Sequence, residues 1–381
     1  MPRITALDAR VVSYGFDHRP RPLSLGSALR RDVVLVRVVC ADGTVGYGES
    51  FHGHAGTAVA EIVNSTMREV VLGREPSETA DVNREVFARF VLSAGMSGGF
   101  LLALSGIDIA MWDAWGKIQG EPVHRLLGGS VTDFALYGGG FTLGFQPPDE
   151  LAEEVRRMRE QSGWQAVKLR IGDSPERDLA RIRHVREVFG DELSIMVDAN
   201  LGHRYDVARV APALAELGVD WLEEPYPPGS PARFVALRSR GLVPVAAGEN
   251  LGGAHEFADW IDRGALDVVQ PDVSRVGGIT EALRIAALAR AAGLRFAPHI
   301  SHSALNHAAT LHLLSAAGGE GIFEADGTVE NPFRDGVISG GPVLANGRAS
   351  LPTGPGLGVT VDEEALGRYP GERGSPFPRP R

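Results

Sequence analysis

Seven short apolar runs between residues 168 and 324 end in side chains that can do acid–base or metal chemistry. Counted from Arg170, these ends follow one another after 28, 25, 26, 23, 27 and 25 residues. About 25 residues accommodate one strand, one helix and two short loops, so the spacing predicts a repeated βα unit. The side chains are Lys168, Arg170, Asp198, Glu223, Glu224, Glu249, Asp272, His299 and Glu324.

Such a repeat predicts an α/β fold in which the strands form a parallel barrel. In a (β/α)8 barrel the carboxyl ends of all strands open on one face, where active sites are built. A single Asp or Glu after a strand is more often a helix N-cap or a turn residue. Seven polar strand ends at one interval instead predict an active site at the barrel mouth.

Three of these carboxylates follow consecutive strands, namely Asp198, Glu223 and Glu249. Unpaired negative charges crowded at one mouth would repel one another, so a positive group is expected between them. Carboxylate oxygens without Cys or His among them suit Mg²⁺, which also takes waters and substrate oxygens. The sequence therefore predicts a magnesium site.

Length and composition exclude several other classes of protein. The 381 residues are enough for a barrel of about 250 residues and a second domain. The net charge of −10, from 38 basic and 48 acidic residues, argues against a nucleic-acid partner. The single cysteine, Cys40, excludes an internal disulfide and fits a reducing compartment. With no signal-peptide pattern and no apolar run of membrane-spanning length, we expect a cytoplasmic protein.

The first 128 residues are predicted to form an α+β domain. Val-rich segments 4–14 and 32–49 favour strands, the second folded back at the turn pair Asp42-Gly43. Three helices are then predicted, over 57–72, 78–93 and 99–119. Strands followed by helices are typical of an α+β domain.

Two segments of this domain are predicted to be loops. Residues 17–30 combine two prolines, one glycine and basic side chains, and a loop of this length is functional or disordered. Residues 50–56 carry His52 and His54. These histidines are either solvated loop residues or contacts for an anionic substrate.

The barrel is predicted over residues 129–336, with helices over 148–162 and 279–292 among others. Gly138–Gly140 with Gly144 form only a weak dinucleotide fingerprint, so a close backbone approach at the mouth is favoured. Residues 337–381 are predicted to return to the first domain and to end in a flexible tail.

Several motifs resemble the enolase superfamily, and within it the mandelate racemase subgroup. SGIDIAMWDAWGKIQGEPVHRLLGG is similar to the last helix of the family's capping domain and its entry into the barrel. VDAN, EEP and GEN resemble the three metal-ligand strands, QPD and PH the Asp-His dyad, and GPGLGV the C-terminal return. These motifs occur in the family's order, and the resemblance covers nearly the whole chain.

The resemblance implies a modified TIM barrel, (β/α)7β, with an N-terminal α+β capping domain completed by the C-terminal segment. It implies that Asp198, Glu223 and Glu249 bind Mg²⁺, with Glu224 beside them. It also implies a homo-oligomer acting on a small carboxylate, in which His299 removes the proton α to that carboxylate. In that scheme Asp272 orients and stabilises the imidazole, Lys168 and Arg170 support the enediolate, and Glu324 contacts a substrate oxygen.

The second barrel strand departs from the family pattern. The subgroup carries Lys-x-Lys there, and this chain has Lys168-Leu169-Arg170. Racemases of the family use the second lysine as a base, and an arginine with a pKa above about 12 is a poor base. Racemisation is therefore disfavoured.

Other side chains near the strand ends have weaker predicted roles. Tyr137, His203 and Tyr205 are candidate general acids. His302, His307 and His312 are interpreted as structural or peripheral.

These expectations favour a Mg²⁺-dependent dehydratase (hydro-lyase) of a sugar acid, an aldonate or aldarate, that forms a 2-keto acid. The enzymatic alternative is a racemase or epimerase of a 2-hydroxy acid, with Lys168 or Arg170 as the opposing base. A third hypothesis, of another class, is a catalytically silent barrel that binds acidic metabolites.

Overall fold

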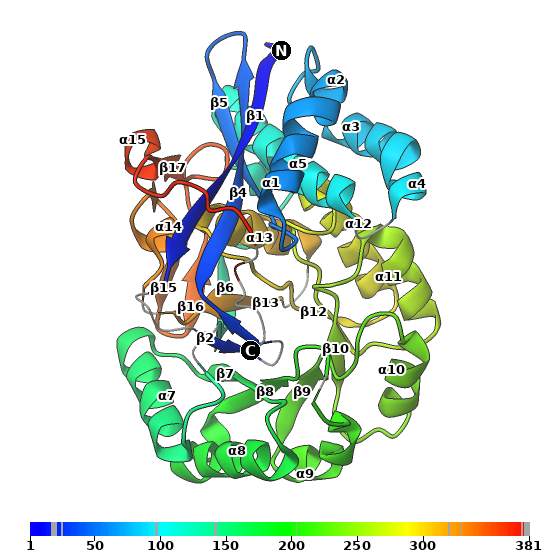
Figure 1. The fold of residues 1–381 in the computed structure, drawn as a ribbon, viewed down its shortest axis with the longest axis vertical. Helices are drawn as coiled ribbons and strands as arrows, with labels where there is room; N and C mark the ends of the chain where they lie inside the picture. Colours follow the sequence, from blue (N-terminus) through cyan, green and yellow to red (C-terminus); the bar gives the residue numbers. More distant parts are fainter. Residues whose placement is uncertain are drawn as a thin grey trace.

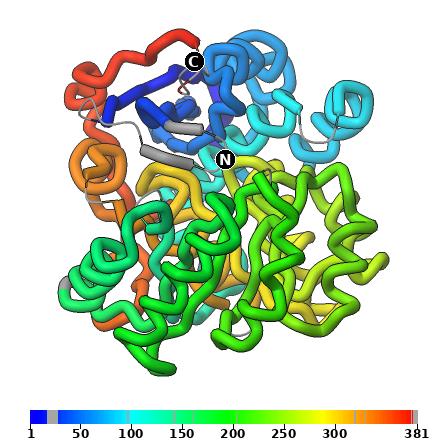
Figure 2. Tube along the Cα trace, turned by 60° about the horizontal axis from the view of Figure 1, so that its bottom comes forward, coloured from blue at the N-terminus to red at the C-terminus, as the bar shows by residue number. Residues whose placement is uncertain are grey.

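The computed structural model describes residues 1–16, 21–23, 26–95, 98–140, 143–202, 204–318, 321–328, 330–374 and 376. Figure 1 shows a capping domain of strands and helices above a barrel-like α/β domain. The tube in Figure 2 shows the red C-terminal segment lying beside the blue N-terminal strands, so the two ends of the chain share one domain.

The capping domain is built on an antiparallel sheet of three strands in the order β1-β4-β5. These are β1 (Ile4–Gly15), β4 (Arg30–Cys40) and β5 (Val45–Ser50). Four of the five valines of β4 are buried, as expected of a central strand covered on both faces; these are Val33, Val34, Val36 and Val38. Gly43 adopts a φ of 87° in the predicted turn between β4 and β5.

The predicted loop over 17–30 is partly wrong. Within it the structure describes a short antiparallel hairpin of β2 (Arg21–Leu23) and β3 (Gly26–Ala28). Residues 17–20 and 24–25 lie outside the described residues.

Helices pack on one face of this sheet, and all three predicted segments are helical. The first two contain short π-helical stretches, over Val63–Met67 and Phe87–Val91. The helices are α1 (Gly56–Ile62), α2 (Arg68–Val71), α3 (Thr79–Val86), α4 (Leu92–Ala94) and α5 (Gly99–Gln119).

Helix α5 approaches β5 closely because glycines line the contact. A Cβ atom on Gly46 or Gly48 would lie 2.1 Å from the carbonyl oxygen of Ala110 or Gly106. Only glycine fits this spacing. The close contact with α5 holds β5, and the loop that follows β5, over the barrel.

Eight parallel strands form the barrel-like domain, in the order β12-β11-β10-β9-β8-β7-β6-β13. No ladder joins β12 to β13 among the described residues. The strands are β6 (Asp133–Gly139), β7 (Ala166–Arg170), β8 (Ser194–Asp198), β9 (Val219–Glu223), β10 (Val245–Ala247), β11 (Val268–Val269), β12 (Arg295–Phe296) and β13 (Ile322–Asp326).

A helix follows each of the first seven strands, which gives the predicted (β/α)7β order. Figure 1 shows α7 to α11 on the outside of the strands. The helices are α7 (Pro148–Ser162), α8 (Pro175–Phe189), α9 (Ala211–Glu216), α10 (Pro231–Arg238), α11 (Gly253–Asp262), α12 (Gly278–Ala291) and α13 (Ala304–Ala317). The short α6 (Val123–Leu126) connects the two domains.

The segment after β13 contacts both domains. Strands β15 (Val343–Ala345) and β16 (Arg348–Ser350) extend the barrel sheet at β6. Farther on, α15 (Glu363–Leu366) lies at the capping domain, where Glu363 accepts from Tyr47 at 2.8 Å. The remaining elements are α14 (Pro332–Asp335), β14 (Ile338–Ser339) and β17 (Thr360–Val361).

The start of the predicted flexible tail is attached to the capping domain. The backbone N–H of Glu372 donates to Ser13 Oγ at 3.0 Å, and Arg30 donates to the carbonyl oxygen of Gly374 at 2.8 Å.

The predicted division of the chain into domains at residues 128 and 336 stays a prediction.

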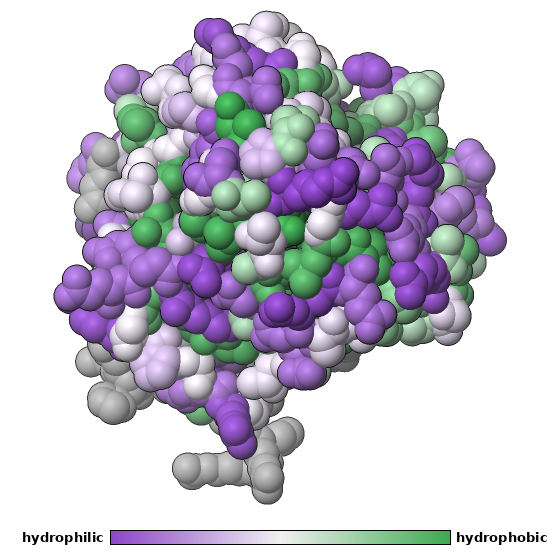
Figure 3. Space-filling model, turned by 90° about the horizontal axis from the view of Figure 1, so that it is seen from above, coloured by the Kyte–Doolittle hydropathy of each residue, from purple (hydrophilic) through white to green (hydrophobic). Residues whose placement is uncertain are grey.

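The surface is mixed in polarity. Viewed from above in Figure 3, hydrophilic residues cover much of the face, and hydrophobic ones show mainly in a band across its middle. None of the helices in the described ranges combines the length and apolar character needed to cross a membrane.

Candidate active site

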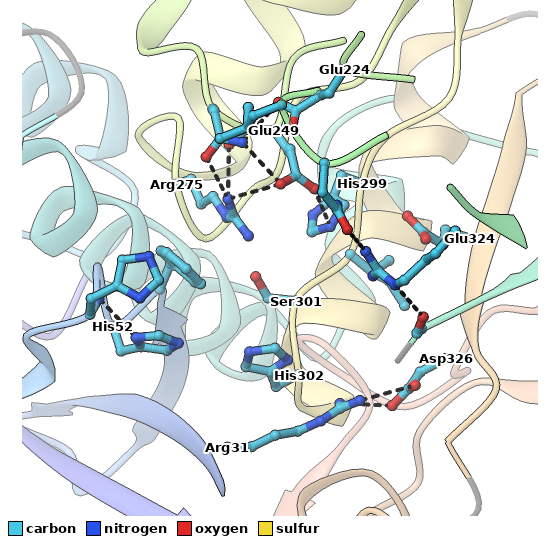
Figure 4. A pocket seen from close by; sticks show the side chains of 18 residues that line it. Arg31, His52, Glu224, Glu249, Arg275, His299, Ser301, His302, Glu324 and Asp326 are labelled. Atoms are coloured by element: carbon cyan, nitrogen blue, oxygen red, sulfur yellow. Dashed lines mark hydrogen bonds and ion pairs between the residues drawn. The ribbon is translucent and has the colours of Figure 1, made fainter. Parts of the chain in front are cut away.

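A cavity of about 190 Å³ lies between the carboxyl ends of the barrel strands and the capping domain. Figure 4 shows its lining side chains converging from both domains. The capping domain contributes Arg31, Phe51, His52 and His54. The barrel contributes, among others, Arg170, Glu224, Glu249, Arg275, His299 and Glu324.

The predicted residues occupy equivalent positions on neighbouring strands. Arg170, Asp198 and Glu223 are the last residues of β7, β8 and β9, and the sheet register places them side by side. Glu249, Asp272 and His299 follow their strands by two or three residues. Glu324 lies within β13.

Each predicted metal-binding carboxylate faces a basic side chain from another strand. Arg170 lies 3.2 Å from Asp198, Lys168 lies 2.7 Å from Glu223, and His299 lies 2.6 Å from Glu249. As these side chains lie, no three His, Cys, Asp or Glu of the described ranges form a group that could hold a metal ion.

The chemistry of the carboxylates nevertheless fits a hard cation. Burial and the negative charges of Asp198 and Glu249 raise the pKa of Glu223 above its usual value. Burial and the same two neighbours raise the pKa of Glu224 still further, and its buried Oε2 has no hydrogen-bond partner. A cation ligated by oxygens would relieve this repulsion. The residues present therefore fit Mg²⁺.

Lys168 lies beneath the cavity and does not line it. Its Nζ is 2.7 Å from Glu223 and 2.9 Å from Glu324, and the side chain is 3% exposed. Burial alone would lower the pKa of Lys168, but these two carboxylates raise it well above its usual value. The amine is therefore held protonated.

His299 and Asp272 form the predicted dyad. His299 Nδ1 lies 2.7 Å from Asp272 Oδ2. Although burial would raise the pKa of Asp272, the hydrogen bond and charge of His299 hold it below its usual range, so Nδ1 donates to a carboxylate. Ser274, Ser301 and Asn306 also donate to Asp272 at 2.7–2.9 Å, which fixes its orientation.

Arg170 is held by three groups at the opposite side of the mouth. Its Nε donates to the carbonyl oxygen of Gly140 at 3.0 Å, and Nη1 contacts both Asp198 and Asn200. Gly140, with a φ of 105°, belongs to the predicted glycine run, which approaches the mouth as expected.

Several lining residues were not predicted from the sequence. Arg275 Nη1 donates to the carbonyl oxygen of Glu249 at 3.3 Å and to Asn250 at 3.2 Å. Arg31 reaches from β4 to Asp326, with Nη1 2.8 Å from Oδ2. Asp326 is two residues beyond Glu324 on the same face of β13, and this period of two was a signal that could have identified it.

Of the two interpretations of His302, structural or peripheral, the second is wrong, because His302 lines the cavity. His307 and His312 are buried, and neither lines it. Their ring nitrogens contact the carbonyl oxygens of Ser301 and Leu357.

The capping domain also binds the loop that follows His299. Glu49 of β5 accepts hydrogen bonds from the backbone N–H groups of His302 and Ser303, at 3.2 and 3.1 Å, and from the Ser303 hydroxyl. The backbone N–H of Phe51 donates to the carbonyl oxygen of Ser274 at 3.0 Å. These contacts could not be predicted from the local sequence, because they join residues more than two hundred positions apart.

Two of the three candidate general acids, Tyr137 and Tyr205, do not line the cavity. Tyr205 donates to Asp178 at 2.8 Å, on the outer side of the strands. Tyr137 is fully buried inside the barrel, below the lining. His203 lies outside the described residues.

Strained backbone is concentrated at the site. Within the described residues, five non-glycine residues have a positive φ, and four of them line the cavity. Such conformations cost of order 1–3 kcal/mol each and cluster where function fixes the geometry. The four are His54, Asn200, Leu201 and Glu224.

Models of two protein families match the chain. Residues 6–128 match the mandelate racemase/muconate lactonizing enzyme N-terminal domain, and residues 150–365 match the enolase C-terminal domain-like family. The first match falls within the capping domain, and the second covers the barrel from α7 onward and most of the segment after β13.

Relatives of known name act on sugar acids. D-galactarolactone cycloisomerase of Agrobacterium fabrum is 34% identical over 89% of this chain and 92% of the relative. Arabinonate dehydratase of Saccharolobus solfataricus is 29% identical over 89% of this chain and 90% of the relative.

Solved structures agree with this family. An enolase-superfamily member from Polaromonas sp. JS666 has a TM-score of 0.94 and 40% identity, covering 99% of this chain and 100% of that one. A racemase from Streptomyces coelicolor A3(2) with bound magnesium has a TM-score of 0.87 and 28% identity, covering 96% and 99%. With both domains and the whole arrangement matched, the chain belongs to the enolase superfamily, as a mandelate racemase-like enzyme.

Proposed function

We propose that this protein is a Mg²⁺-dependent dehydratase of a sugar acid, an aldonate or aldarate, that forms a 2-keto acid. The observation that carries the proposal is the asymmetry of proton acceptors around the mouth. His299, oriented by Asp272, lies on one side. Although burial would lower the pKa of His299, Glu249 and Asp272 raise it to about 10, so the proposal requires that the contact of Nε2 with Glu249 be released before Nε2 accepts a proton. On the other side β7 presents Arg170, held by Gly140, Asp198 and Asn200, with the protonated Lys168 beneath it.

Dehydration needs a base on one face of the substrate only. His299 Nε2 takes the α-proton, and the electron pair of that C–H bond moves into the carboxylate to give an enediolate. As the enediolate collapses, the β-carbon–oxygen bond breaks. The imidazolium returns its proton to the departing hydroxyl, so that water leaves, and the enol formed tautomerises to the 2-keto acid.

The charges around the mouth support the enediolate. Arg170 is permanently protonated, and Lys168 is held protonated, so both oppose the negative charge that develops on the substrate carboxylate. Asp198, Glu223 and Glu249 would hold Mg²⁺, which supplies further positive charge beside that carboxylate when it is bound.

A cycloisomerase is the second candidate, because a named relative at 34% identity has that activity. In that reaction too, a base removes the α-proton from one face of the substrate. The β-carbon–oxygen bond that then breaks belongs to a ring, so the oxygen stays in the molecule and the mass is unchanged. A racemase has weaker support, because it needs a proton acceptor on each face of the substrate. On the second face, β7 presents only the protonated side chains of Lys168 and Arg170.

The deciding experiment incubates purified protein and Mg²⁺ with aldonic acids, aldaric acids and their lactones in D2O. Once the deuterium taken up from D2O as the enol tautomerises is allowed for, a dehydratase gives a 2-keto product lighter than its substrate by one water, and a cycloisomerase gives a product of equal mass. Inverted substrate that accumulates without loss of water would refute the dehydratase. Absence of both magnesium binding and turnover would favour a catalytically silent barrel.

A further inference from the structure

The end of the cavity under the capping domain differs in chemistry from the end at the carboxylates. Figure 4 shows His52 on the far side from Glu324, with His302 and Arg31 along the same wall. His52 stacks on His302, with ring centroids 6.0 Å apart and planes 16° apart, and it also contacts Phe51 at 4.3 Å. In the proposed function the substrate carboxylate lies near the barrel carboxylates and Arg170, so its remaining carbons would extend toward this wall.

The hydrogen-bond geometry fixes the tautomer of His52. The backbone N–H of His54 donates to His52 Nδ1 at 2.9 Å, so the lone pair of Nδ1 is occupied and the ring proton of neutral His52 lies on Nε2. No described residue accepts a hydrogen bond from Nε2, although the side chain lines the cavity. His52 therefore offers one N–H donor to whatever enters.

The surroundings keep His52 uncharged. Burial, together with the positive charges of His54, Arg275 and Arg30, lowers the pKa of His52 to about 3. Burial likewise lowers the pKa of His302 well below its usual value, with contributions from Arg31 and His52. At neutral pH both rings can serve hydroxyl groups, and neither supplies a positive charge for a carboxylate.

The arginines described at this end already have anionic partners. Arg31 binds Asp326 through two contacts of 2.8 and 3.3 Å. Arg275 stacks 3.8 Å over the ring of Phe51 and lies 3.6 Å from Glu249. A second substrate carboxylate here would meet these paired cations and the negative charge of Asp326.

We propose that this end of the cavity binds the hydroxyl-bearing tail of a substrate with a single carboxylate, and that His52 is a specificity-determining residue whose Nε2–H donates to a tail hydroxyl. The enzyme then acts on aldonates, or on lactones of one free carboxylate, in preference to aldarates. This inference rests on the proposed function and narrows its substrate class. It also replaces the hypothesis from the sequence that His52 contacts an anion.

The test compares acids that share a carbon skeleton and differ only at the far end. D-gluconate is paired with D-glucarate, and D-galactonate with galactarate, each with Mg²⁺. We expect kcat/KM for whichever monoacid is accepted to exceed that of its diacid partner by roughly tenfold or more, since burying an unpaired carboxylate is costly. A diacid turned over as well as its monoacid partner overturns the inference.

Binding separates this inference from the proposed function. The His299→Asn variant is titrated calorimetrically with the same pairs, so that affinity is measured without turnover. Tighter binding of the monoacid without any turnover by the wild type would refute the dehydratase and support the binding preference. Failure to bind either member of both pairs would overturn the two together.

Three substitutions test His52 itself. His52→Phe keeps a ring and removes the donor, so KM for the monoacid is expected to rise roughly tenfold with a smaller change in kcat. His52→Gln places an amide N–H near the position of Nε2 and is expected to restore KM. His52→Lys adds a positive charge and is expected to shift the preference toward the diacid.

The matched control is His255→Phe, on the exposed side of α11, where no change in KM is expected. If His52→Phe also leaves KM and the monoacid-to-diacid ratio unchanged, the assignment of His52 is wrong. The same conclusion follows if His52→Gln behaves like His52→Phe.

Discussion

Glu249 and His299 both line the cavity and are in direct contact, with Glu249 Oε2 2.6 Å from His299 Nε2. Although burial would raise the pKa of Glu249, His299 and Arg275 hold it well below its usual value. The nitrogen proposed to accept the α-proton is thus paired with a carboxylate proposed to bind Mg²⁺. If Glu249 binds Mg²⁺ through Oε2, this contact would be released, which would couple magnesium binding to the availability of the base.

Glu249→Gln tests the magnesium site. The substitution removes one of three charged ligands, so the affinity for Mg²⁺ is expected to fall about tenfold or more, and activity with it, while the fold is retained. Calorimetric titration with MgCl₂ measures the affinity, and circular dichroism checks the fold. Glu187→Gln, on the exposed face of α8, is the matched control. Unchanged affinity in the Glu249 variant would contradict the ligand assignment.

His299→Asn tests the base. The variant keeps a polar side chain but has no group of suitable pKa, so we expect exchange of the substrate α-proton with D2O to slow by about 10²–10⁴. Proton NMR of the recovered substrate measures this exchange. Asp272→Asn is also expected to slow it, because the imidazole loses its orienting carboxylate. Exchange at the wild-type rate in the His299 variant would place the base elsewhere.

Arg170→Lys tests why β7 departs from the family pattern. Lysine cannot bind Gly140, Asp198 and Asn200 together, as the guanidinium does. We expect dehydration to slow by about tenfold or more and slow inversion at the α-carbon to become detectable. Chiral chromatography of recovered substrate distinguishes the two outcomes. Faster dehydration in the variant would show that Arg170 is not the favourable charge proposed.

Asp326→Asn tests the buried ion pair between the two domains. Arg31 and Asp326 are 2–3% exposed, so leaving Arg31 without a charged partner is expected to cost about 3–5 kcal/mol of unfolding free energy at pH 7. Urea unfolding of wild type and variant measures this difference. Asp335→Asn, which alters an exposed carboxylate nearby, is expected to change stability by less than about 0.5 kcal/mol.

The same pair predicts a dependence on pH. Although burial would raise the pKa of Asp326, Arg31 and Arg334 hold it below its usual range. A carboxylate whose folded pKa is depressed stabilises the fold above its unfolded pKa, about 3.9, and loses that contribution as the pH falls further. The stability difference between wild type and Asp326→Asn should therefore shrink as the pH is lowered from 5 toward 3. A difference that stays constant would contradict the assigned charge state.

The sequence was sufficient to place side chains that follow strands at a regular interval. Asp198, Glu223 and Glu249 could be predicted because a parallel βα repeat brings every strand end to one mouth. Arg31 and Asp326 could not be paired, since they are nearly three hundred positions apart and no periodicity relates a capping strand to a barrel strand. His302 was misjudged because its place depends on how Glu49 holds the loop after His299.

The sequence also did not reveal the protonation state of individual side chains. His52 suggested an anion contact by its type, but its neutral state depends on burial and on arginines from other elements. Lys168 by its type is a possible base, yet Glu223 and Glu324 keep it protonated. Residue type sets the reference pKa, and only the packed surroundings set the state in which the group works.

The hydrogen bonds that the backbone N–H groups of His302 and Ser303 donate to Glu49 limit how this enzyme can be re-engineered. One way to change the substrate specificity of such a fold is to transplant a whole capping domain from a relative onto this barrel. A transplanted domain without an acid at this position would leave these two N–H groups, three and four residues beyond His299, without their acceptor. Chimeras should therefore be designed with Glu49 and the 301–303 loop exchanged as one inseparable part.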